Sequence, residues 1–313
     1  MRDRAMRRLL HSRVAWIVAA ALAVAVVLPW WMSAYILGVL TTAYYFGVFA
    51  MSWDLLFGFA GEVNFGPTFL IGLGAYTAGL LDNALHPPIA VCVVVGALVA
   101  MLGGLLLAVP ALRLRGPYFG LVTLVAVLLL RNAIIIFAGV TGGEIGMNVS
   151  DVLSIDATTN YWIGLVFLVV CGVILFGLSR SAVGLILQAS GQDAIQAAAL
   201  GFNVTKHKLA AFCVSALFSG LAGAMLVFYE GTVSVDTVVD IAIAVQIIIA
   251  VVLGGRRTIL GAVIGAIFLI LAGELLRPLG QLNTLVVAAV ALAAILFFPD
   301  GLLGHALRPG RRE

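Results

Sequence analysis

The stretch SGQDAIQAAALGFNVTKHK (190–208) interrupts an otherwise strongly apolar chain. The runs on either side, 160–179 and 208–229, are each long enough to cross a lipid bilayer as a helix. A polar segment between two such runs emerges from the membrane, so its residues meet water or another protein. The apolar pattern around this stretch sets the fold, and the pattern within it bears on function.

The composition is that of an integral membrane protein. Hydrophobic residues occupy 63% of the 313 positions and charged residues only 10%, whereas soluble domains carry charge at about a quarter of their positions. The three cysteines, Cys92, Cys171 and Cys213, lie far apart in apolar runs, which argues against a disulfide framework and a CxxC metal site. The histidines are equally dispersed, so no metal site is expected. We therefore predict a single all-α membrane domain over 1–313.

Apolar length predicts ten membrane-spanning helices. Their ranges are 14–32, 33–53, 66–82, 88–110, 117–140, 160–179, 208–229, 240–254, 258–276 and 282–298. The third is short and rich in glycine and the eighth is barely long enough, so either is a candidate for a re-entrant or broken helix. The basic head resembles that of a signal peptide, but the apolar run continues past Trp30 and Trp31, which favours an uncleaved anchor.

The basic residues predict how these spans are oriented. By the positive-inside rule, the arginines of segment 1–13 place the N-terminus in the cytoplasm. Ten alternating crossings then place the loop 180–207 and the tail 299–313 in the cytoplasm as well, and both are basic. Only Arg131 and Arg277 fall on the opposite face, where acidic residues gather. Both termini are therefore predicted to be cytoplasmic.

The polar stretch predicts a helix over 191–200. Ser190 and Asp193 have the spacing of a capping box, and Gly201 stands where a left-handed residue would end the helix. The apolar positions recur at helical spacing and form one stripe, which comprises Ile195, Ala198, Ala199 and Phe202. This stripe has either the membrane or a protein surface as its partner, and the absence of Lys and Arg from 191–200 favours protein.

Four stretches together resemble the LivM-type permease family of branched-chain amino-acid ABC importers. They are LLFGFAGEVNFGPTFLIGLGAYTAGLL (55–81), LRLRGPYFGLVTL with TGGEIGM (112–147), AIQAAALGFNVTKHKLAAFCVSALFSGLAGAML (194–226), and LGGRRTILGAVIGA with FFPDGLLG (253–304). Members of that family tend to keep glycine and small residues after the GG pair, where this chain has Arg256 and Arg257.

The resemblance implies that the helix in the loop 180–207 is a coupling helix, which sits in a groove of an ATP-binding subunit. The residues that it assigns to this contact are Gln192, Asp193, Ile195, Ala198, Ala199, Leu200, Gly201 and Phe202. The chain itself has no G-x-x-x-x-G-K-[ST] motif, so ATP and Mg²⁺ are expected on partner subunits. This chain is not expected to be an enzyme.

The resemblance also implies the rest of the assembly. Its members would be a second, LivH-like permease, two ATP-binding subunits and a periplasmic solute-binding protein, in a bacterial inner membrane that the chain crosses many times. Lipid surrounds such a subunit, and no nucleic-acid partner is expected. Leucine, isoleucine and valine are the default substrates. The alternatives are a urea or amide permease of the same family and a secondary transporter driven by an ion gradient.

Four polar residues are candidates for the translocation path. Glu62 and Asn64 lie in a glycine-rich break between predicted spans, where a broken helix can meet a zwitterionic ligand, although a solvated loop would hold the same residues. Arg131 lies fourteen residues beyond Pro117, about 21 Å along a helix and past the centre of the bilayer. It is expected either to pair with Glu144 or to extend to the outer interface.

Two sets of small residues predict close helix packing. Gly261 and Gly265 form a GxxxG pattern, and Gly220, Gly223 and Ala224 form a second small-residue face. Faces of this kind pack helices within one chain or, alternatively, between two permeases.

Overall fold

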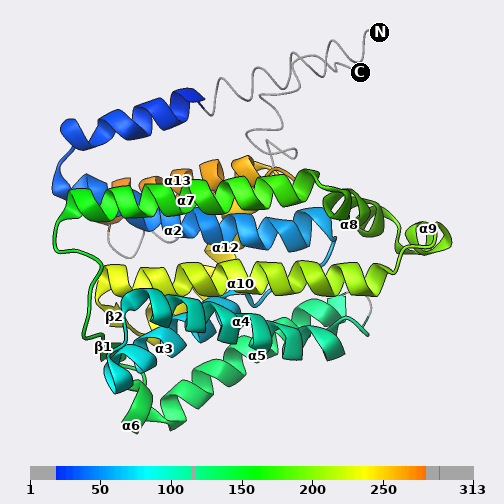
Figure 1. Ribbon diagram of the computed structural model, residues 1–313, viewed down its shortest axis with the longest axis horizontal. Helices are drawn as coiled ribbons and strands as arrows, with labels where there is room; N and C mark the ends of the chain where they lie inside the picture. The colour runs from blue at the N-terminus through cyan, green and yellow to red at the C-terminus, as the bar shows by residue number, and fades with distance from the viewer. Residues whose placement is uncertain (1–18, 115–116, 280–288, 290–313) are drawn as a thin grey trace.

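The computed structural model describes residues 19–114, 117–279 and 289, and these residues are mostly helical. The predicted terminal segments 1–13 and 299–313 lie outside the described residues, as does the tenth predicted span except for residue 289. The long helices run side by side along one axis of the molecule (Figure 1).

The described chain begins with an apolar helix from Ala19 to Trp30, which closes in the 3-10 turn η1 (Leu28–Trp30). The elements that follow are α2 (Ala34–Asp54), the π-helical segment η2 (Leu55–Phe59), α3 (Pro67–Leu85), α4 (Ile89–Ala111), α5 (Pro117–Ile136), α6 (Ala138–Thr141), β1 (Met147–Asn148), α7 (Ala157–Arg180), α8 (Ala182–Gln192), α9 (Ala194–Ala199), α10 (Val204–Glu230), β2 (Thr232–Val233), α11 (Val235–Val238), α12 (Ile241–Gly254), α13 (Ile259–Leu275) and the 3-10 turn η3 (Arg277–Leu279). Each of the first nine predicted spans overlaps a helix, and six helices of the described chain are long and apolar enough to cross a membrane.

The third predicted span is an unbroken helix, so the expectation of a break there is wrong. α3 covers 19 residues, has Pro67 at its start and ends at His86, which has a left-handed φ of 47°. Its glycines serve close packing instead, because a Cβ atom on Gly74 would overlap the carbonyl of Gly220 in α10. A glycine-rich apolar run therefore fits tight helix packing as well as it fits a break.

The eighth predicted span is short, and a second helix extends it. α11 and α12 together form an apolar segment of 20 residues from Val235 to Gly254. Asp240 lies at their junction, and its carboxylate accepts a 2.6 Å hydrogen bond from the backbone N–H of Ala242. The irregularity therefore falls at one end of the span.

The two ends of the bundle differ in structure. Strands β1 and β2 pair antiparallel, with Met147 opposite Val233 and Asn148 opposite Thr232, and we call the end that holds them the ribbon end. Helices α8 and α9 lie at the opposite end, where α9 projects beyond the tips of the other helices (Figure 1). We call this second end the α9 end.

Carboxylates order the loops at the ribbon end. Asp82, near the end of α3, accepts hydrogen bonds from the backbone N–H groups of Ser150 at 2.7 Å and Asp151 at 3.1 Å. Asp156 caps α7, and hydrogen bonds from the hydroxyl and the backbone N–H of Thr159 hold the pKa of this carboxyl below its ordinary value. The long connection from α6 to α7 is thus tied to the bundle.

Helices α2 and α10 form the centre of the bundle. α10 packs against α3, α4 and α2, while α2 also contacts α7, α12 and α13. These two helices supply many of the largest fully buried side chains, among them Trp53, Tyr45, Phe49, Phe212 and Phe228. Polar side chains also join them, since the hydroxyl groups of Ser52 and Ser219 lie 2.8 Å apart and Ser215 donates to the carbonyl of Ser52 at 2.7 Å.

The outer helices turn large apolar side chains away from the core. Leu106 of α4, Leu129 of α5 and Val173 of α7 are each more than 60% exposed. Soluble monomers rarely carry so much exposed apolar surface, whereas a lipid bilayer covers it.

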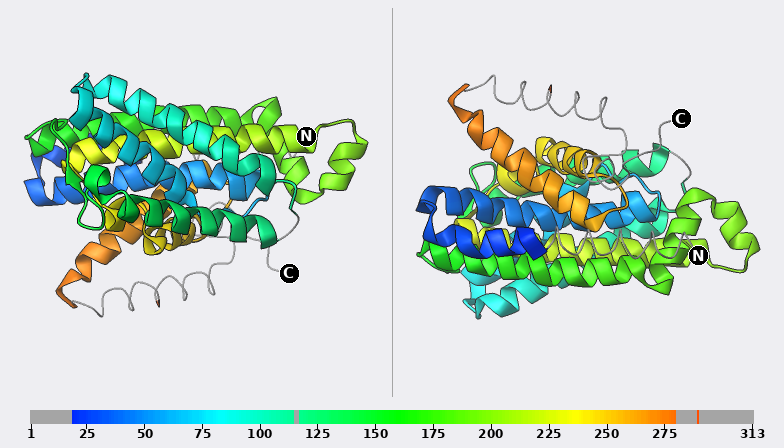
Figure 2. Two further views of the ribbon diagram at one scale, coloured as in Figure 1. Left: turned by 90° about the horizontal axis from the view of Figure 1, so that it is seen from below. Right: turned by 90° about the horizontal axis from the view of Figure 1, so that it is seen from above.

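Helices α12 and α13 lie together on one side of α2, where α13 runs obliquely (Figure 2).

Candidate functional site

The polar stretch forms two short helices where the sequence predicts one. α8 ends at Gln192 and α9 begins at Ala194, so the predicted helix over 191–200 is wrong in its start. Asp193 separates the two helices with an extended backbone, at φ −149° and ψ 102°. The chain therefore changes direction inside the segment that the sequence assigns to a single helix.

The predicted capping box is also wrong, because Asp193 itself is the cap. Its carboxylate accepts hydrogen bonds from the backbone N–H groups of Ile195 at 2.9 Å and Gln196 at 3.0 Å. Ser190 instead donates to the carbonyl of Ile186 within α8, at 2.8 Å. A serine and an aspartate three residues apart can each cap a helix, and the extension of α8 through this region decides in favour of the aspartate.

The C-terminal end of α9 is as the sequence predicts. Gly201 has a left-handed φ of 89°, its N–H donates to the carbonyl of Ala198 at 2.9 Å, and the N–H of Phe202 donates to Ala197 at 3.3 Å. This pair of hydrogen bonds is a Schellman motif, which satisfies carbonyl groups that the helix itself leaves unpaired. Caps at both ends therefore satisfy backbone groups that a helix of six residues cannot pair by itself.

The apolar surface of α9 is uncovered. Ile195 is 83% exposed and Leu200 is 75% exposed, while Ala197 is buried and fixes the helix to the rest of the molecule. Ala198, Ala199, Gly201 and Phe202 are exposed as well, as are Gln192 and Ala194. Figure 1 shows α9 as the outermost element at its end of the bundle. Within the described part of the chain, Phe202 of the predicted stripe meets the ring of His207 edge-on, while Ile195 stays uncovered.

The base of this projection rests on the segment after α2. Gly191 of α8 meets Gly61 backbone to backbone, because a Cβ atom on either would lie under 3.0 Å from the main chain of the other segment. Gly61 also has a left-handed φ of 73°. Next to it, Glu62 forms a 2.6 Å ion pair with Lys208 in the first turns of α10. The first contact holds α8 against the connection between η2 and α3, and the second holds the start of α10 against the same connection.

Asn64, the other candidate of this loop, has an internal structural contact. Its side chain is 1% exposed and accepts a hydrogen bond from the N–H of Gly66 at 2.8 Å. The indole N–H of Trp53 donates to the backbone carbonyl of Asn64 at 2.6 Å. Glu62 and Asn64 therefore shape the connection between η2 and α3, and their part in translocation stays a prediction.

A buried carboxylate, which sequence reasoning missed, joins this region to α12 and α13. Asp54 is fully buried at the end of α2, and its Oδ1 accepts a 3.0 Å hydrogen bond from the backbone N–H of Arg257. Arg257 adopts a left-handed φ of 64°, and its Nε donates to the carbonyl of Gly58 at 2.8 Å. The second carboxylate oxygen of Asp54, Oδ2, has no hydrogen-bond partner among the described residues. The partners are 203 residues apart in the chain, so no local pattern reveals the contact.

Arg131 reaches Glu144, the partner considered from the sequence. The charged groups lie 3.9 Å apart, and the side chains are 38% and 68% exposed. Glu144 is close to β1, so the pair belongs to the ribbon end. An exposed pair of this length contributes little stability. Its role in the translocation path stays a prediction.

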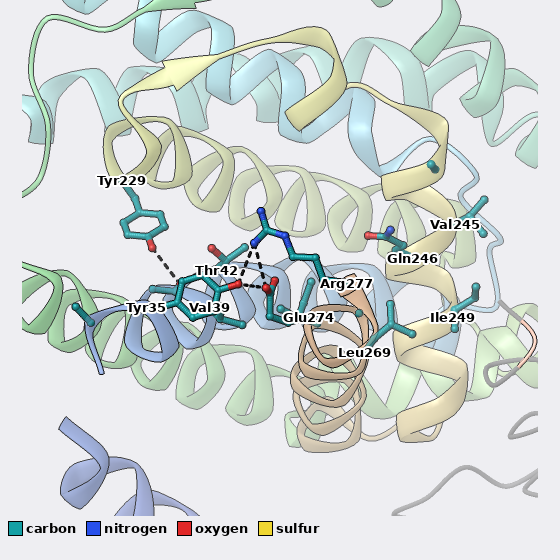
Figure 3. Close-up of a pocket in the computed structure, with 15 residues that line it drawn as sticks. Tyr35, Val39, Thr42, Tyr229, Val245, Gln246, Ile249, Leu269, Glu274 and Arg277 are labelled. Carbon is teal, nitrogen blue, oxygen red and sulfur yellow. Dashed lines mark hydrogen bonds and ion pairs between the residues drawn. The ribbon is translucent and has the colours of Figure 1, made fainter. Parts of the chain in front are cut away.

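A cavity of about 820 Å³ opens at the ribbon end between α2, α12 and α13 (Figure 3). Tyr229 of α10 closes one side, where its hydroxyl donates to the carbonyl of Gly38 at 3.0 Å. Aliphatic side chains form one wall, namely Val39, Val245, Ile249, Leu269 and Ile270. The polar side chains that line it are Tyr35, Thr42, Gln246, Glu274 and Arg277.

Three of these polar residues form one cluster. Nη1 of Arg277 donates to the hydroxyl of Tyr35 at 2.9 Å and lies 3.1 Å from Oε1 of Glu274, and the Tyr35 hydroxyl also donates to Glu274. Figure 3 shows the three side chains converging at the edge of the cavity. The sequence singled out Arg277 as a basic residue on the face where acidic residues gather, and only the packing of α2 against α13 brings Tyr35 to it. Within the described part of the chain, no group of His, Cys, Asp and Glu side chains could hold a metal ion.

The comparison with known families decides the identity of the fold. The family model described as Branched-chain amino acid transport system / permease component matches residues 35–299. The chain belongs to this family. The match contains every described element from α2 to η3 except the first residue of α2, and therefore the α8–α9 segment and the cavity as well.

This permease is similar to proteins named High-affinity branched-chain amino acid transport system permease protein LivM. It is 27% identical to the one from Salmonella typhimurium over 318 residues, which cover 91% of this chain and 73% of that protein. The corresponding protein of Escherichia coli is 27% identical over 320 residues, with 91% and 74% covered. No solved structure matches the chain.

These comparisons confirm the resemblance drawn from the four sequence stretches. They agree with a branched-chain amino-acid permease and give no support to a urea or amide permease or to an ion-gradient-driven transporter. Proteins of this family are transport subunits, so the chain is a permease component rather than an enzyme.

Proposed function

We propose that this permease is one membrane half of an ATP-driven importer of branched-chain amino acids in a bacterial inner membrane. It crosses the membrane ten times with both termini in the cytoplasm, beside a second, LivH-like permease. Two ATP-binding subunits bind ATP and Mg²⁺ on the cytoplasmic side, and a periplasmic binding protein delivers the substrate. The family membership and the names of the similar proteins support the class of transporter and its substrate.

The distribution of charge supports a cytoplasmic α9 end. Arg180 leads into α8, Lys206 and Lys208 follow α9, and Arg257 contacts the end of α2. The two basic residues that depart from the positive-inside pattern, Arg131 and Arg277, are paired with Glu144 and Glu274 at the ribbon end. Since an acidic partner neutralises each of them, neither argues against an outward-facing ribbon end.

The exposed surface of α9 is the observation that carries the coupling role. Ile195 and Leu200 project from a helix that is capped at both ends, stands outside the bundle and carries no Lys or Arg to bind lipid headgroups. A short, pre-formed helix with an apolar surface suits insertion into a groove of a protein partner. The residues proposed to make this contact run from Gln192 to Phe202.

The contacts below α9 give its movement a route into the membrane domain. A displacement of α9 would be transmitted to Gly61 through its contact with Gly191. Gly61 follows η2, which is the π-helical continuation of α2. π-helical segments inside α-helices recur at functional sites. Asp54 and Arg257 then connect this segment to the α12–α13 turn, which leads to the helices that line the cavity. Alternating access follows if these contacts transmit closure of the ATP-binding subunits.

The test is co-purification of the importer from gently solubilised native membranes. The surface variants Ile195→Asp and Leu200→Asp place a charge on the docking surface of α9, and Leu114→Asp, at a 43% exposed site after α4, is the matched control. We expect two P-loop ATPase subunits and a second permease with the wild type and the control, and loss of the ATPases alone with the α9 variants. Retention of the ATPases by both α9 variants would overturn the coupling role.

A further inference from the structure

We propose that the cavity between α2, α12 and α13 is a binding site for the transported amino acid in its zwitterionic form. Arg277 receives the carboxylate, Glu274 receives the ammonium group, and the aliphatic wall receives the side chain. This inference rests on the proposed function for the identity of the substrate, and on the geometry of the cavity for its location.

The cavity has a suitable size and position. Its volume of about 820 Å³ falls in the range of about 300 to 1,000 Å³ that is usual for small-molecule sites. Its lining comes from the ends of α2, α10, α12 and α13 that lie at the ribbon end. A substrate delivered to that face therefore meets the cavity first.

The charged cluster is complementary to a zwitterion. Both contacts of Arg277 with described residues use Nη1, so Nη2 and Nε are available for a carboxylate. The side chain of Arg277 is 68% exposed and that of Glu274 is 28% exposed, so a ligand can reach both. A cation and an anion 3.1 Å apart match the adjacent ammonium and carboxylate groups of an α-amino acid.

The aliphatic wall provides the other half of the recognition. Val245 and Ile249 on α12, Leu269 on α13 and Val39 on α2 all line the cavity. A branched side chain gains free energy by leaving water for such a surface, while each methylene group adds only a modest preference. The wall therefore accepts leucine, isoleucine and valine without a sharp choice among them.

A lipid tail is the other occupant to consider. An acyl chain would fill the aliphatic part, but it makes no use of the Tyr35, Glu274 and Arg277 cluster. Charged side chains in a membrane domain are costly and are usually retained for a ligand, an ion or a partner. The combination of an aliphatic wall with one cation and one anion favours an amino acid.

Photo-crosslinking of the intact importer in lipid nanodiscs tests this site. The probe is a diazirine analogue of leucine, and mass spectrometry locates the labelled residues. We expect label within 34–42, 242–249 and 269–277, and competition by unlabelled leucine. Isocaproate, which lacks the amino group, and isoamylamine, which lacks the carboxylate, should each compete at least about tenfold less well, because each forgoes its contact with one of the two charged side chains.

Two variants separate recognition from folding. In the Glu274→Gln variant, leucine should compete with the probe no better than isocaproate does. In the Arg277→Gln variant, leucine should compete no better than isoamylamine does. Asp151→Asn, which removes an exposed carboxylate at the same end, is the matched control and should keep both preferences. A variant that only disturbed the fold would weaken all three competitors alike.

The outcomes distinguish this inference from the proposed function. Label that leucine does not displace, or label on other helices, overturns the binding site even if ATP-dependent leucine uptake is normal. Displacement of the label by phospholipid but not by leucine likewise overturns it, and identifies a lipid site. The binding site is supported if leucine displaces the label from the cavity and if each variant loses only the preference that its own charged side chain provides. This support holds whether or not the ATPase subunits dock on α9.

Discussion

Close packing through small residues occurs in two regions of the molecule, namely the helix set α3, α4 and α10 and the helix pair α12 and α13. In the first set, a Cβ atom on Gly74 would overlap Gly220, and one on Gly220 would overlap Ala100. In the pair, Gly254 meets Gly261 as closely, and Gly265 meets Ala250. Both regions bring helix backbones into direct contact through small residues within one chain, as the glycine patterns predict.

The two regions differ in what surrounds them. In the most apolar part of the α10 span 72% of residues are buried, against 33% in α4 and 44% in the span formed by α11 and α12. The α12–α13 pair contacts α2 through the buried Asp54 near one end and borders the cavity near the other. We propose that α10, with α3 and α4 packed against it through glycine, is a fixed frame, and that α12 and α13 form a unit that the proposed ligand and ATPase subunits can shift.

The largest effect is expected from a bulky side chain placed between the helices of the frame. Gly220→Leu would force side-chain atoms into Ala100 and the backbone of α4, so we expect a loss of about 3 kcal/mol or more and failure to recover folded protein. Size-exclusion chromatography and thermal unfolding in detergent measure this. Gly177→Leu in α7, where a Cβ atom meets nothing within 4 Å, should behave like the wild type. Equal behaviour of the two variants would contradict a tightly packed frame.

A smaller and more local effect is expected at the link to the moving pair. Asp54→Ala removes the acceptor of the Arg257 N–H and leaves a part-buried donor unpaired, which costs about 1 kcal/mol. Hydrogen exchange should rise in the α12–α13 turn, residues 255–258, and stay unchanged in α3, α4 and α10. Asp54→Asn keeps an acceptor oxygen and should show less of this rise. Faster exchange spread evenly over the bundle would remove the distinction between the two regions.

These regions also show what the sequence can and cannot predict. Apolar length located the helices because a segment that crosses a membrane is long and apolar and satisfies its own backbone groups as a helix. It misread α3, because glycine favours both broken helices and close packing. It could not foresee Asp54 with Arg257, or Tyr35 with Glu274 and Arg277, because those contacts join parts of the chain that only the tertiary fold brings together.

The α8–α9 segment was predicted in outline and wrong in detail. Its polarity, its left-handed Gly201 and its apolar stripe follow from local pattern, since caps and periodicity are local properties. The break at Asp193 depends on α8 continuing from Ser181 and packing against Gly61, which the sequence does not reveal.

An effect of about 1 to 2 kcal/mol is expected at Gly201, confined to α9. Alanine at this φ of 89° is strained, so Gly201→Ala should loosen the helix end without lowering the unfolding temperature of the bundle. Hydrogen exchange of residues 194–203 measures the loosening. Gly139→Ala in α6, a position with open space around it, should leave that exchange unchanged. A large drop in bundle stability would show that α9 belongs to the frame.

The smallest effect is expected at the exposed pair near β1. Arg131→Gln removes a contact of 3.9 Å between exposed groups, so the change in stability should stay within about 0.5 kcal/mol. Thermal unfolding at low and high salt measures it. A loss that salt does not reduce would give Arg131 a buried partner in the assembled importer.

ATP-dependent uptake of labelled leucine by the reconstituted importer tests the central claim most directly. The wild type should accumulate leucine only with ATP inside, on the ATPase side. The Ile195→Asp variant should bind leucine as the wild type does and yet fail to accumulate it. Uptake by Ile195→Asp at the wild-type rate, or wild-type uptake that needs an ion gradient and no ATP, would contradict the account.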